Sequence, residues 1–359
     1  MDQPTRNRQR RLALGLGLAW VLPTSAKPGE THKSPHTARS TTGRTYGHQP
    51  AVQAFAAQAA AHEGLDAGWV EQHLAQARRQ EAVRKLIMPP PAGTAKNWAA
   101  YRARFIEPQR ITAGLAFWRS HQVWLDQAQA RWGVPPGIVA AIVGVETFYG
   151  RVMGSFRVID ALATLSFDFP PGRKDRSEFF RSELRAFFVM CQREGSNPLA
   201  IQGSFAGAMG LPQFMPSSVN RFALDFDGDG HIDLQRSPAD VVGSVAHFLA
   251  QAGWERDLPT HHAVRVPVDT SARATLLAPD IVPSFSAAQF AEHGALLDEA
   301  GRAHDGPLAL IELQNGSLAP SYVAGTRNFY VVTRYNWSSY YAMAVIDLAQ
   351  ALQAGMERG

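Results

Sequence analysis

The stretch Val134–Arg151, VPPGIVAAIVGVETFYGR, decides the fold because it is a run of small and apolar residues that contains one carboxylate, Glu146. The two adjacent prolines near its start suit the first turn of a helix, where a missing N–H donor costs nothing. Ile138, Ile142 and Glu146 then fall at i, i+4 and i+8. This spacing predicts a core helix that carries a carboxyl group on its apolar stripe.

The position of Glu146 indicates a general acid. Burial disfavours the ionised form of a carboxyl, so its pKa rises towards the range in which it gives and regains a proton near neutral pH. The alternative is a structural glutamate that pairs with Arg151 or reaches solvent at the helix end. This segment alone leaves both interpretations open.

Composition and charge narrow the class of protein. The 359 residues are 45% hydrophobic, enough for a sizeable core in about two or three globular units. Residues 1–26 have a basic start, an apolar stretch and small residues at the end, which predicts a cleaved signal peptide and a periplasmic protein. They hold four of the 35 Lys and Arg and one of the 31 Asp and Glu, which leaves 31 basic and 30 acidic residues. A nearly neutral mature chain gives no support for nucleic-acid binding.

The chain contains no later apolar run of membrane-spanning length, so we expect no integral membrane span in the mature form. Its one cysteine, Cys191, excludes an internal disulfide. Because Cys191 lies in an apolar helical pattern, we expect a buried and unreactive thiol.

The residue pattern divides the rest of the chain into five segments and predicts a mainly α (α+β) fold. Residues 27–48 are typical of a flexible tether, 49–132 of a helical domain and 133–260 of a helical core. Strand-like runs indicate a small β-containing domain over 261–332, and residues 333–359 return to helical periodicity. The strand-like runs are Ala263–Val268, Leu308–Leu313 and Phe329–Thr333.

The segment Gly203–Ser218, GSFAGAMGLPQFMPSS, indicates close approach of the backbone to a ligand or to another helix. Its glycines permit tight turns, and Ser204 and Gln213 offer hydrogen bonds to a polar substrate. The alternative is a tightly packed crossing of helices, which needs small residues. Both interpretations can be true at once.

The run Asp225–Asp233, DFDGDGHID, follows the first nine positions of an EF-hand calcium loop. Carboxylates at alternating positions repel one another unless a cation lies between them, which predicts a structural Ca²⁺. Position 12, usually a bidentate Glu, is Arg236, so the last ligand must come from elsewhere. A solvated turn without metal is the alternative. The expected ligands are Asp225, Asp227, Asp229, the His231 carbonyl and Asp240.

With the C-terminal RYN of Arg334–Asn336, these segments resemble the lytic murein transglycosylase B family, and they occur in that family's order. The resemblance spans roughly residues 50–355. It implies a lysozyme-like helical catalytic core with a helical N-terminal domain and a small β-containing insertion. It further implies calcium in the Asp225 loop, Glu146 as the catalytic acid and base, and a substrate site made by Ser204, Gln213, Tyr335, Asn336 and Tyr341. Departures from the family's usual residues leave fine subsite preferences open: Phe205, Leu211–Pro212 and Trp337.

The reaction that the resemblance implies is cleavage of peptidoglycan glycan strands without water, by one glutamate and with no catalytic cofactor. A water-using muramidase is the first alternative, and it needs a second carboxylate about 5–9 Å from Glu146. Asp160 and Asp168 are the first acidic residues that follow Glu146 along the chain, although Asp160 has the position of a helix cap. A catalytically silent peptidoglycan-binding protein is the second. We expect a monomer that acts on glycan strands, with other cell-wall enzymes as further partners.

Overall fold

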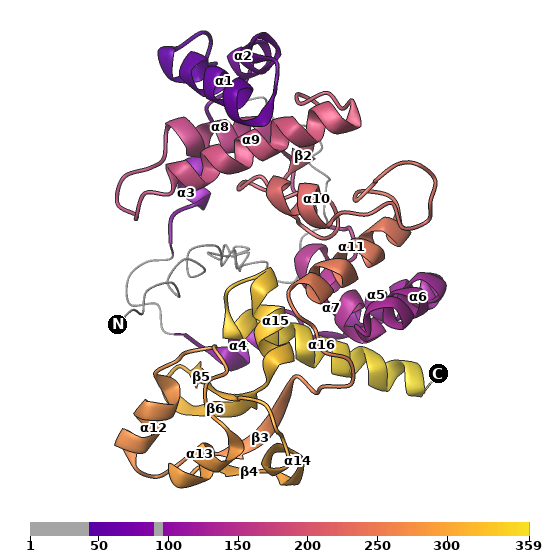
Figure 1. The fold of residues 1–359 in the computed structure, drawn as a ribbon, viewed down its shortest axis with the longest axis vertical. Helices are drawn as coiled ribbons and strands as arrows, with labels where there is room; N and C mark the ends of the chain where they lie inside the picture. Colours follow the sequence, from indigo (N-terminus) through magenta and orange to yellow (C-terminus); the bar gives the residue numbers. More distant parts are fainter. Residues whose placement is uncertain (1–42, 90–95, 359) are drawn as a thin grey trace, which may run out of the picture.

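The computed structural model describes residues 43–89 and 96–358. The predicted signal peptide and most of the predicted tether lie outside these residues. In the described part the fold is mainly helical, with one four-stranded sheet and a second, two-stranded ladder (Figure 1). Within the same ranges, no helix combines the length and the apolar character that crossing a membrane requires.

A first group of helices occupies the upper part of Figure 1. It comprises α1 (Pro50–Glu63), α2 (Ala67–Ala75), α3 (Glu81–Leu86), α8 (Val158–Phe167), α9 (Ser177–Glu194) and, beside α9, α10 (Pro216–Phe222). α9 buries Phe180, Leu184, Phe187 and Cys191 at helical spacing on one face. Burial raises the pKa of the Cys191 thiol to about 12, in agreement with the expected unreactive thiol.

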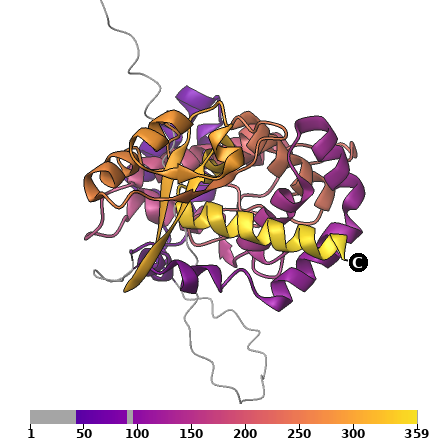
Figure 2. The ribbon, with the colours of Figure 1, turned by 90° about the horizontal axis from the view of Figure 1, so that it is seen from below.

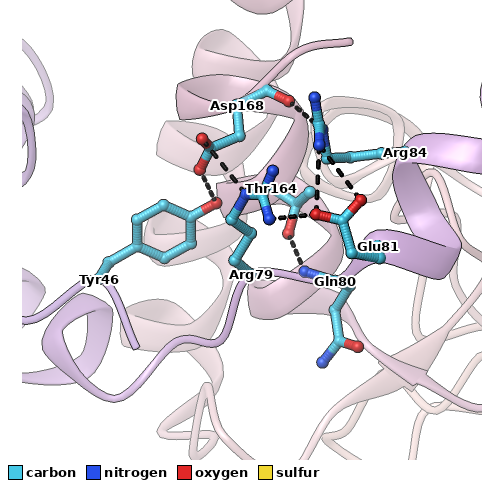
Figure 3. A network of polar contacts seen from close by, with 7 residues as sticks. All are labelled: Tyr46, Arg79, Gln80, Glu81, Arg84, Thr164 and Asp168. Carbon is cyan, nitrogen blue, oxygen red and sulfur yellow. Dashed lines mark hydrogen bonds and ion pairs between the residues drawn. The ribbon is translucent and has the colours of Figure 1, made fainter. Parts of the chain in front are cut away.

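Polar contacts fix the N-terminal segment to α8 (Figure 3). The Tyr46 hydroxyl donates to Asp168 at 2.7 Å, and the Arg79 guanidinium lies 3.4 Å from the same carboxylate. The Gln80 N–H donates to the Thr164 hydroxyl at 3.0 Å. Asp168 is therefore committed to holding the two segments together.

A second group of helices surrounds α7, which contacts α5, α6, α11 and α16. Residues 49–132, expected as one helical domain, thus contribute to both groups, because α1–α3 pack on α8 and α9 whereas α5 and α6 pack on α7. The elements of the second group are α4 (Trp98–Arg102), α5 (Pro108–Ser120), α6 (Gln122–Trp132), α7 (Pro136–Thr147), α11 (Pro238–Gln251), α15 (Arg327–Tyr335) and α16 (Ser339–Glu357).

The small β domain lies at the bottom of Figure 1 and has its own apolar core around Phe290 and Leu310. Its antiparallel sheet has the order β4-β3-β6-β5, with Ile311 opposite Val323 in the β5–β6 hairpin. The elements are β3 (His261–Arg265), α12 (Thr270–Leu277), α13 (Ala287–Glu292), β4 (Leu296–Leu297), α14 (Glu299–Arg302), β5 (Ala309–Asn315) and β6 (Leu318–Gly325). The two-stranded ladder pairs β1 (Phe156–Arg157) with β2 (Gln202–Gly203).

One strand expectation is wrong: Phe329–Thr333 lies in helix α15. The Thr326 hydroxyl caps this helix by accepting from the Asn328 N–H at 3.1 Å. Phe329 and Val332 are both buried and fall three apart, which suits a helical face. A short apolar run does not by itself distinguish a strand from a buried helix segment.

Helix α16 connects the β domain to the core around α7. Figure 2 shows this helix, in yellow, extending from the β domain to the C-terminus. It contacts β5, α4, α5 and α7. The start of α16 therefore lies where residues of the sheet and of α7 come close together.

Candidate active site

Glu146 lies in the last turn of α7, where it is half-buried while the other residues of the helix are buried. Directly after it the chain turns sharply, because Phe148 and Tyr149 both have left-handed backbone conformations with φ of 52° and 56°. Such conformations cost non-glycine residues about 1–3 kcal/mol each and are most often retained at functional sites. The Thr147 hydroxyl donates to the Leu211 carbonyl at 3.0 Å, which fixes the helix end to the Gly203–Ser218 segment.

The carboxyl of Glu146 has one hydrogen-bond donor, the Tyr341 hydroxyl, at 2.6 Å from Oε1. Burial raises the pKa of Glu146 to about 7, and the hydrogen bond from Tyr341 opposes this rise. Arg151, the partner in the structural alternative, instead lies with its guanidinium 4.6 Å from the Phe148 ring centre. A carboxyl whose pKa is raised to about 7 can give and regain a proton near neutral pH, as a proton-transfer group must.

Two further tyrosines surround this carboxyl. The Tyr335 ring stacks on Tyr341 with centroids 6.3 Å apart, and its hydroxyl donates to the Pro212 carbonyl at 2.5 Å. Burial, followed by the charge of Glu146, raises the pKa of both Tyr335 and Tyr101. All three phenols therefore stay neutral hydrogen-bond donors at any physiological pH.

Tyr101 was missed by the sequence reasoning. Its spacing relative to Trp98 and Phe105 is that of core aromatics, and its ring does contact both of theirs. Nothing in the local pattern distinguishes it from a packing residue, because its proximity to Glu146 depends on α4 and α7 meeting in the fold.

Arg110 was also missed. Its guanidinium donates to the Gly144 carbonyl in the last turn of α7 and lies between the rings of Phe148, at 4.3 Å, and Phe105, at 5.4 Å. A cation at the carbonyl end of a helix stabilises that end. Arg110 therefore supports the turn that carries Glu146.

The Gly203–Ser218 segment contributes one side chain with unused hydrogen-bonding capacity. The Gln213 amide nitrogen donates to the Gly210 carbonyl at 2.9 Å, while its oxygen is buried without a partner among the described residues. Ser204 is only 2% exposed and accepts from the Ala208 N–H at 3.0 Å, so in this conformation it holds the loop together.

The C-terminal RYN contributes a second such group. Asn336 follows α15 directly, is 7% exposed, and its amide oxygen also has no partner within the described residues. Tyr335 and Tyr341, on either side of Asn336 in the sequence, both lie near Glu146. Two amide oxygens from distant segments therefore remain available to accept hydrogen bonds.

The first two carboxylates that follow Glu146 along the chain have structural partners. Asp160 is 2% exposed and accepts from the Arg157 guanidinium at 2.6 and 2.9 Å and from the Arg78 N–H at 2.9 Å. Asp168 binds the N-terminal segment in the network of Figure 3. No second carboxylate of the described chain is among the causes of the raised Glu146 pKa.

The acidic loop brings three of its expected ligands together. Carboxylate oxygens of Asp225, Asp227 and Asp229 all lie within 4.8 Å of one another. The N–H groups of Gly228 and Gly230 donate to Asp225 at 2.7 and 2.8 Å, and this shapes the loop around the three carboxylates.

The remaining expected ligands, His231 and Asp240, lie differently. Both Asp240 oxygens accept main-chain N–H groups, from Phe226 and Asp233, each at 2.8 Å. Asp240 is thus found outside the converging group, where it ties the two ends of the loop. His231 donates its N–H to Asp229 at 2.8 Å and leaves its carbonyl for a ligand.

A helical core that holds a carboxyl with a pKa near 7 suits an enzyme of lysozyme-like fold that cleaves glycans by proton transfer. The sequence pattern of the transglycosylase SLT domain matches residues 47–350. The chain belongs to this family of lytic transglycosylases.

Four relatives illustrate the likeness. The membrane-bound lytic murein transglycosylase B of Escherichia coli (strain K12) is 38% identical over 318 residues, 86% of this chain and 84% of that protein. The crystal structure of soluble lytic transglycosylase SltB1 from Pseudomonas aeruginosa has a TM-score of 0.78 at 38% identity, over 86% of this chain and 100% of that one.

Two further similar structures each contain a ligand. The lytic transglycosylase Slt35 of Escherichia coli in complex with calcium has a TM-score of 0.74 at 37% identity, over 87% of this chain and 96% of that one. SltB3 from Pseudomonas aeruginosa in complex with NAG-NAM-pentapeptide has a TM-score of 0.73 at 30% identity, over 86% and 80%.

Proposed function

We propose that the chain cleaves the β-1,4 bond between N-acetylmuramic acid and N-acetylglucosamine in peptidoglycan, with Glu146 acting first as acid and then as base. The observation that carries this proposal is a carboxyl with a pKa near 7, which accepts a hydrogen bond from Tyr341 and whose pKa is lowered by no cation of the described residues. Such a group is protonated often enough to donate and ionised often enough to accept.

In the first step the proton of Glu146 goes to the glycosidic oxygen, and the bond from that oxygen to C1 of the muramoyl sugar breaks. The N-acetyl group of the same sugar stabilises the positive charge that develops at C1. The Tyr341 hydroxyl then stabilises the carboxylate that the transfer creates, because its hydrogen bond favours the ionised form.

In the second step the ionised Glu146 takes the proton from the C6 hydroxyl of the muramoyl sugar, and that oxygen bonds to C1. The product is a 1,6-anhydro ring, the carboxyl is protonated again, and no water is consumed. Gln213 and Asn336 have free amide oxygens suited to sugar hydroxyl or N-acetyl N–H groups. We assign Tyr335 to the same substrate site, and Ser204 to it through the loop that it braces.

The rival muramidase reaction needs a second carboxylate to activate water or to bond with the sugar. Asp160 and Asp168 do not suit this role, because both are held by arginine side chains and main-chain or phenol donors. No other carboxylate of the described residues contributes to the raised pKa of Glu146, and this likewise favours attack by the substrate's own hydroxyl.

We propose a structural Ca²⁺ in the loop of Asp225, Asp227 and Asp229. Three converging carboxylates suit a hard divalent cation with oxygen ligands, and a similar protein, Slt35, has been crystallised in complex with calcium. The His231 carbonyl would add a ligand, whereas Asp240 would fix the loop ends from behind. The ion would stabilise the loop and take no part in the reaction.

We also propose that the protein acts in the periplasm on glycan strands as a monomer. The sequence of residues 1–26 supports export, and the wall substrate lies outside the cytoplasm. We also propose other cell-wall enzymes as partners, because they meet the same substrate outside the cytoplasm.

Product analysis tests the proposed reaction. Purified peptidoglycan sacculi are digested and the soluble fragments are weighed by mass spectrometry. We expect muramoyl ends that are one water lighter than reducing ends. Reducing ends would point to the muramidase, and intact sacculi to a binding protein. Glu146→Gln, which keeps the shape of the side chain and cannot cycle a proton, is expected to lower the rate by several orders of magnitude.

A further inference from the structure

A polar pocket of about 190 Å³ lies where the β domain meets the start of α16. Lys96, Asp280, Glu312, Gln314 and Tyr340 line it, together with apolar residues of β5 and the end of α12. Glu146 is not among the lining residues. The pocket is therefore separate from the catalytic carboxyl, and its volume suits a small polar group better than a sugar chain.

The pocket contains charges of both signs that do not neutralise one another. Among the described residues, neither Asp280 nor Glu312 has a Lys or Arg within ion-pair distance, and the Lys96 ammonium lies 6.0 Å from the Tyr340 ring centre. Asp280 is held in a left-handed backbone conformation, with φ of 56°. Unpaired charges of opposite sign around one small pocket match a ligand that carries both an ammonium and a carboxylate.

Hydrogen bonds from neighbouring residues also hold the side chains of the pocket in place before a ligand binds. The Tyr322 hydroxyl donates to Glu312 at 2.7 Å, and the Gln314 amide donates to the other oxygen at 3.2 Å. Tyr340 accepts from the Gln314 N–H at 2.7 Å, which fixes its ring at the pocket wall. Side chains that are held before binding lose less entropy when a ligand arrives.

One aromatic layer separates the pocket from the catalytic carboxyl. The Tyr340 ring lies 5.8 Å from that of Tyr101, whose pKa is raised in part by the charge of Glu146. The neighbouring residue Tyr341 donates directly to Glu146. A peptide of three extended residues spans about 10 Å, long enough to cross such a layer.

We propose that this pocket binds the zwitterionic amino-acid end of a peptide stem on the glycan strand being cleaved, with Asp280 and Glu312 at its ammonium and Lys96 at its carboxylate. This inference rests on the proposed function, because the stem belongs to the muramoyl sugar of that substrate. A related enzyme, SltB3, has been crystallised with a pentapeptide-bearing disaccharide. The pocket would make the enzyme prefer strands that still carry their stems.

The first test compares steady-state kinetics on strands with stems and on strands stripped by an amidase. Asp280→Asn and Lys96→Gln are each expected to raise KM about fivefold on strands with stems, the effect of losing one charge-assisted contact near the surface, and to leave kcat unchanged. On stripped strands both variants should match the wild type. Asp126→Asn, an exposed carboxylate on α6, serves as the control and should change neither.

A second test uses the free stem. A tripeptide ending in meso-diaminopimelate, whose last carbon carries both charges, is titrated by calorimetry into the full chain and each variant. A matched tripeptide ending in lysine has the same α-carboxylate but only an ammonium at the end of its side chain, so Lys96→Gln should weaken binding of the first peptide and leave that of the second unchanged. Equal effects on both peptides, or none, would overturn the assignment of Lys96.

The two proposals fail in different ways. If the wild type makes no anhydro products from strands with stems, the proposed reaction is wrong whatever the pocket does. If it makes them and the Asp280 and Lys96 variants behave alike on both kinds of strand, the reaction stands and the pocket does not bind stems. Equal melting temperatures for the variants and the wild type exclude misfolding as the cause of a raised KM.

Discussion

Tyr341→Phe tests whether one hydrogen bond sets the protonation of Glu146, the proposed acid and base. The change removes the donor 2.6 Å from Glu146 and keeps the ring that stacks on Tyr335. A hydrogen bond to a charged group is worth about 1.5–3 kcal/mol, and one pH unit corresponds to about 1.4 kcal/mol. Because the bond favours the carboxylate, its loss should raise the pKa of Glu146 from about 7 by about one to two units.

The assay is the pH dependence of kcat/KM on purified glycan strands. The first step needs a protonated Glu146, so kcat/KM is high below its pKa and falls as pH rises through it. In Tyr341→Phe this descending limb should move to higher pH by the same one to two units. Tyr335→Phe is the matched control, because its hydroxyl binds the Pro212 carbonyl and not Glu146. A descending limb that stays at the wild-type position in Tyr341→Phe would refute the reasoning.

Three further predictions concern stability. Because the pKa of Glu146 is raised in the folded state, the unfolded chain ionises first as pH rises above the ordinary pKa of 4.5, and the folded state loses stability. In urea unfolding, Glu146→Gln should therefore be as stable as the wild type at pH 4. At pH 8 its free energy of unfolding should exceed that of the wild type by up to about 3 kcal/mol. Ca²⁺ should raise the melting temperature by several degrees relative to a chelator, and Asp229→Ala should abolish the difference; coincident wild-type melts would mean that the loop binds no calcium. Gly207 has φ of 88°, and an added Cβ would lie 2.5 Å from Leu162, so Gly207→Ala should lower stability by about 2–4 kcal/mol. Gly195→Ala, with similar φ and open space, should cost only about 1 kcal/mol, and equal melting temperatures for the two would exclude a steric cause.

Local patterns were sufficient to predict those features that depend on neighbours in the sequence. The α7 helix, its lone Glu146 and the three carboxylates of the acidic loop follow from spacing and residue type. The same reasoning was wrong for Phe329–Thr333, because β-branched and aromatic residues suit a buried helix face as well as a strand. Spacing could not predict that Asp240 accepts two loop N–H groups, because these contacts depend on how α11 packs; its role as a calcium ligand stays a prediction.

The resemblance to a family supplied the residues that local patterns miss. Tyr335 and Asn336 belong to the RYN segment and Tyr341 follows it, and nothing in their own spacing connects them with Glu146. Arg110 and Tyr101 were not found by either route. Each reaches the end of α7 from a helix whose sequence reads as ordinary packing, so only the tertiary structure reveals it.

The hydrogen bond from Tyr341 to Glu146 joins residues 195 positions apart, and this separation explains why the β domain matters for the chemistry. The sheet lies between these residues in the sequence, and its last strand, β6, leads directly into α15 and α16. Tyr340 fixes the start of α16 to β5 by hydrogen bonds to both the N–H and the carbonyl of Gln314. A change that loosens this attachment would move Tyr341 and so alter the pKa of Glu146 without touching the catalytic residue. Tyr340→Phe, which removes both hydrogen bonds and keeps the ring, should therefore shift the descending limb of the pH profile in the same direction as Tyr341→Phe and by less. An unshifted limb in Tyr340→Phe, beside a shifted one in Tyr341→Phe, would mean that the core positions Tyr341 without help from the sheet.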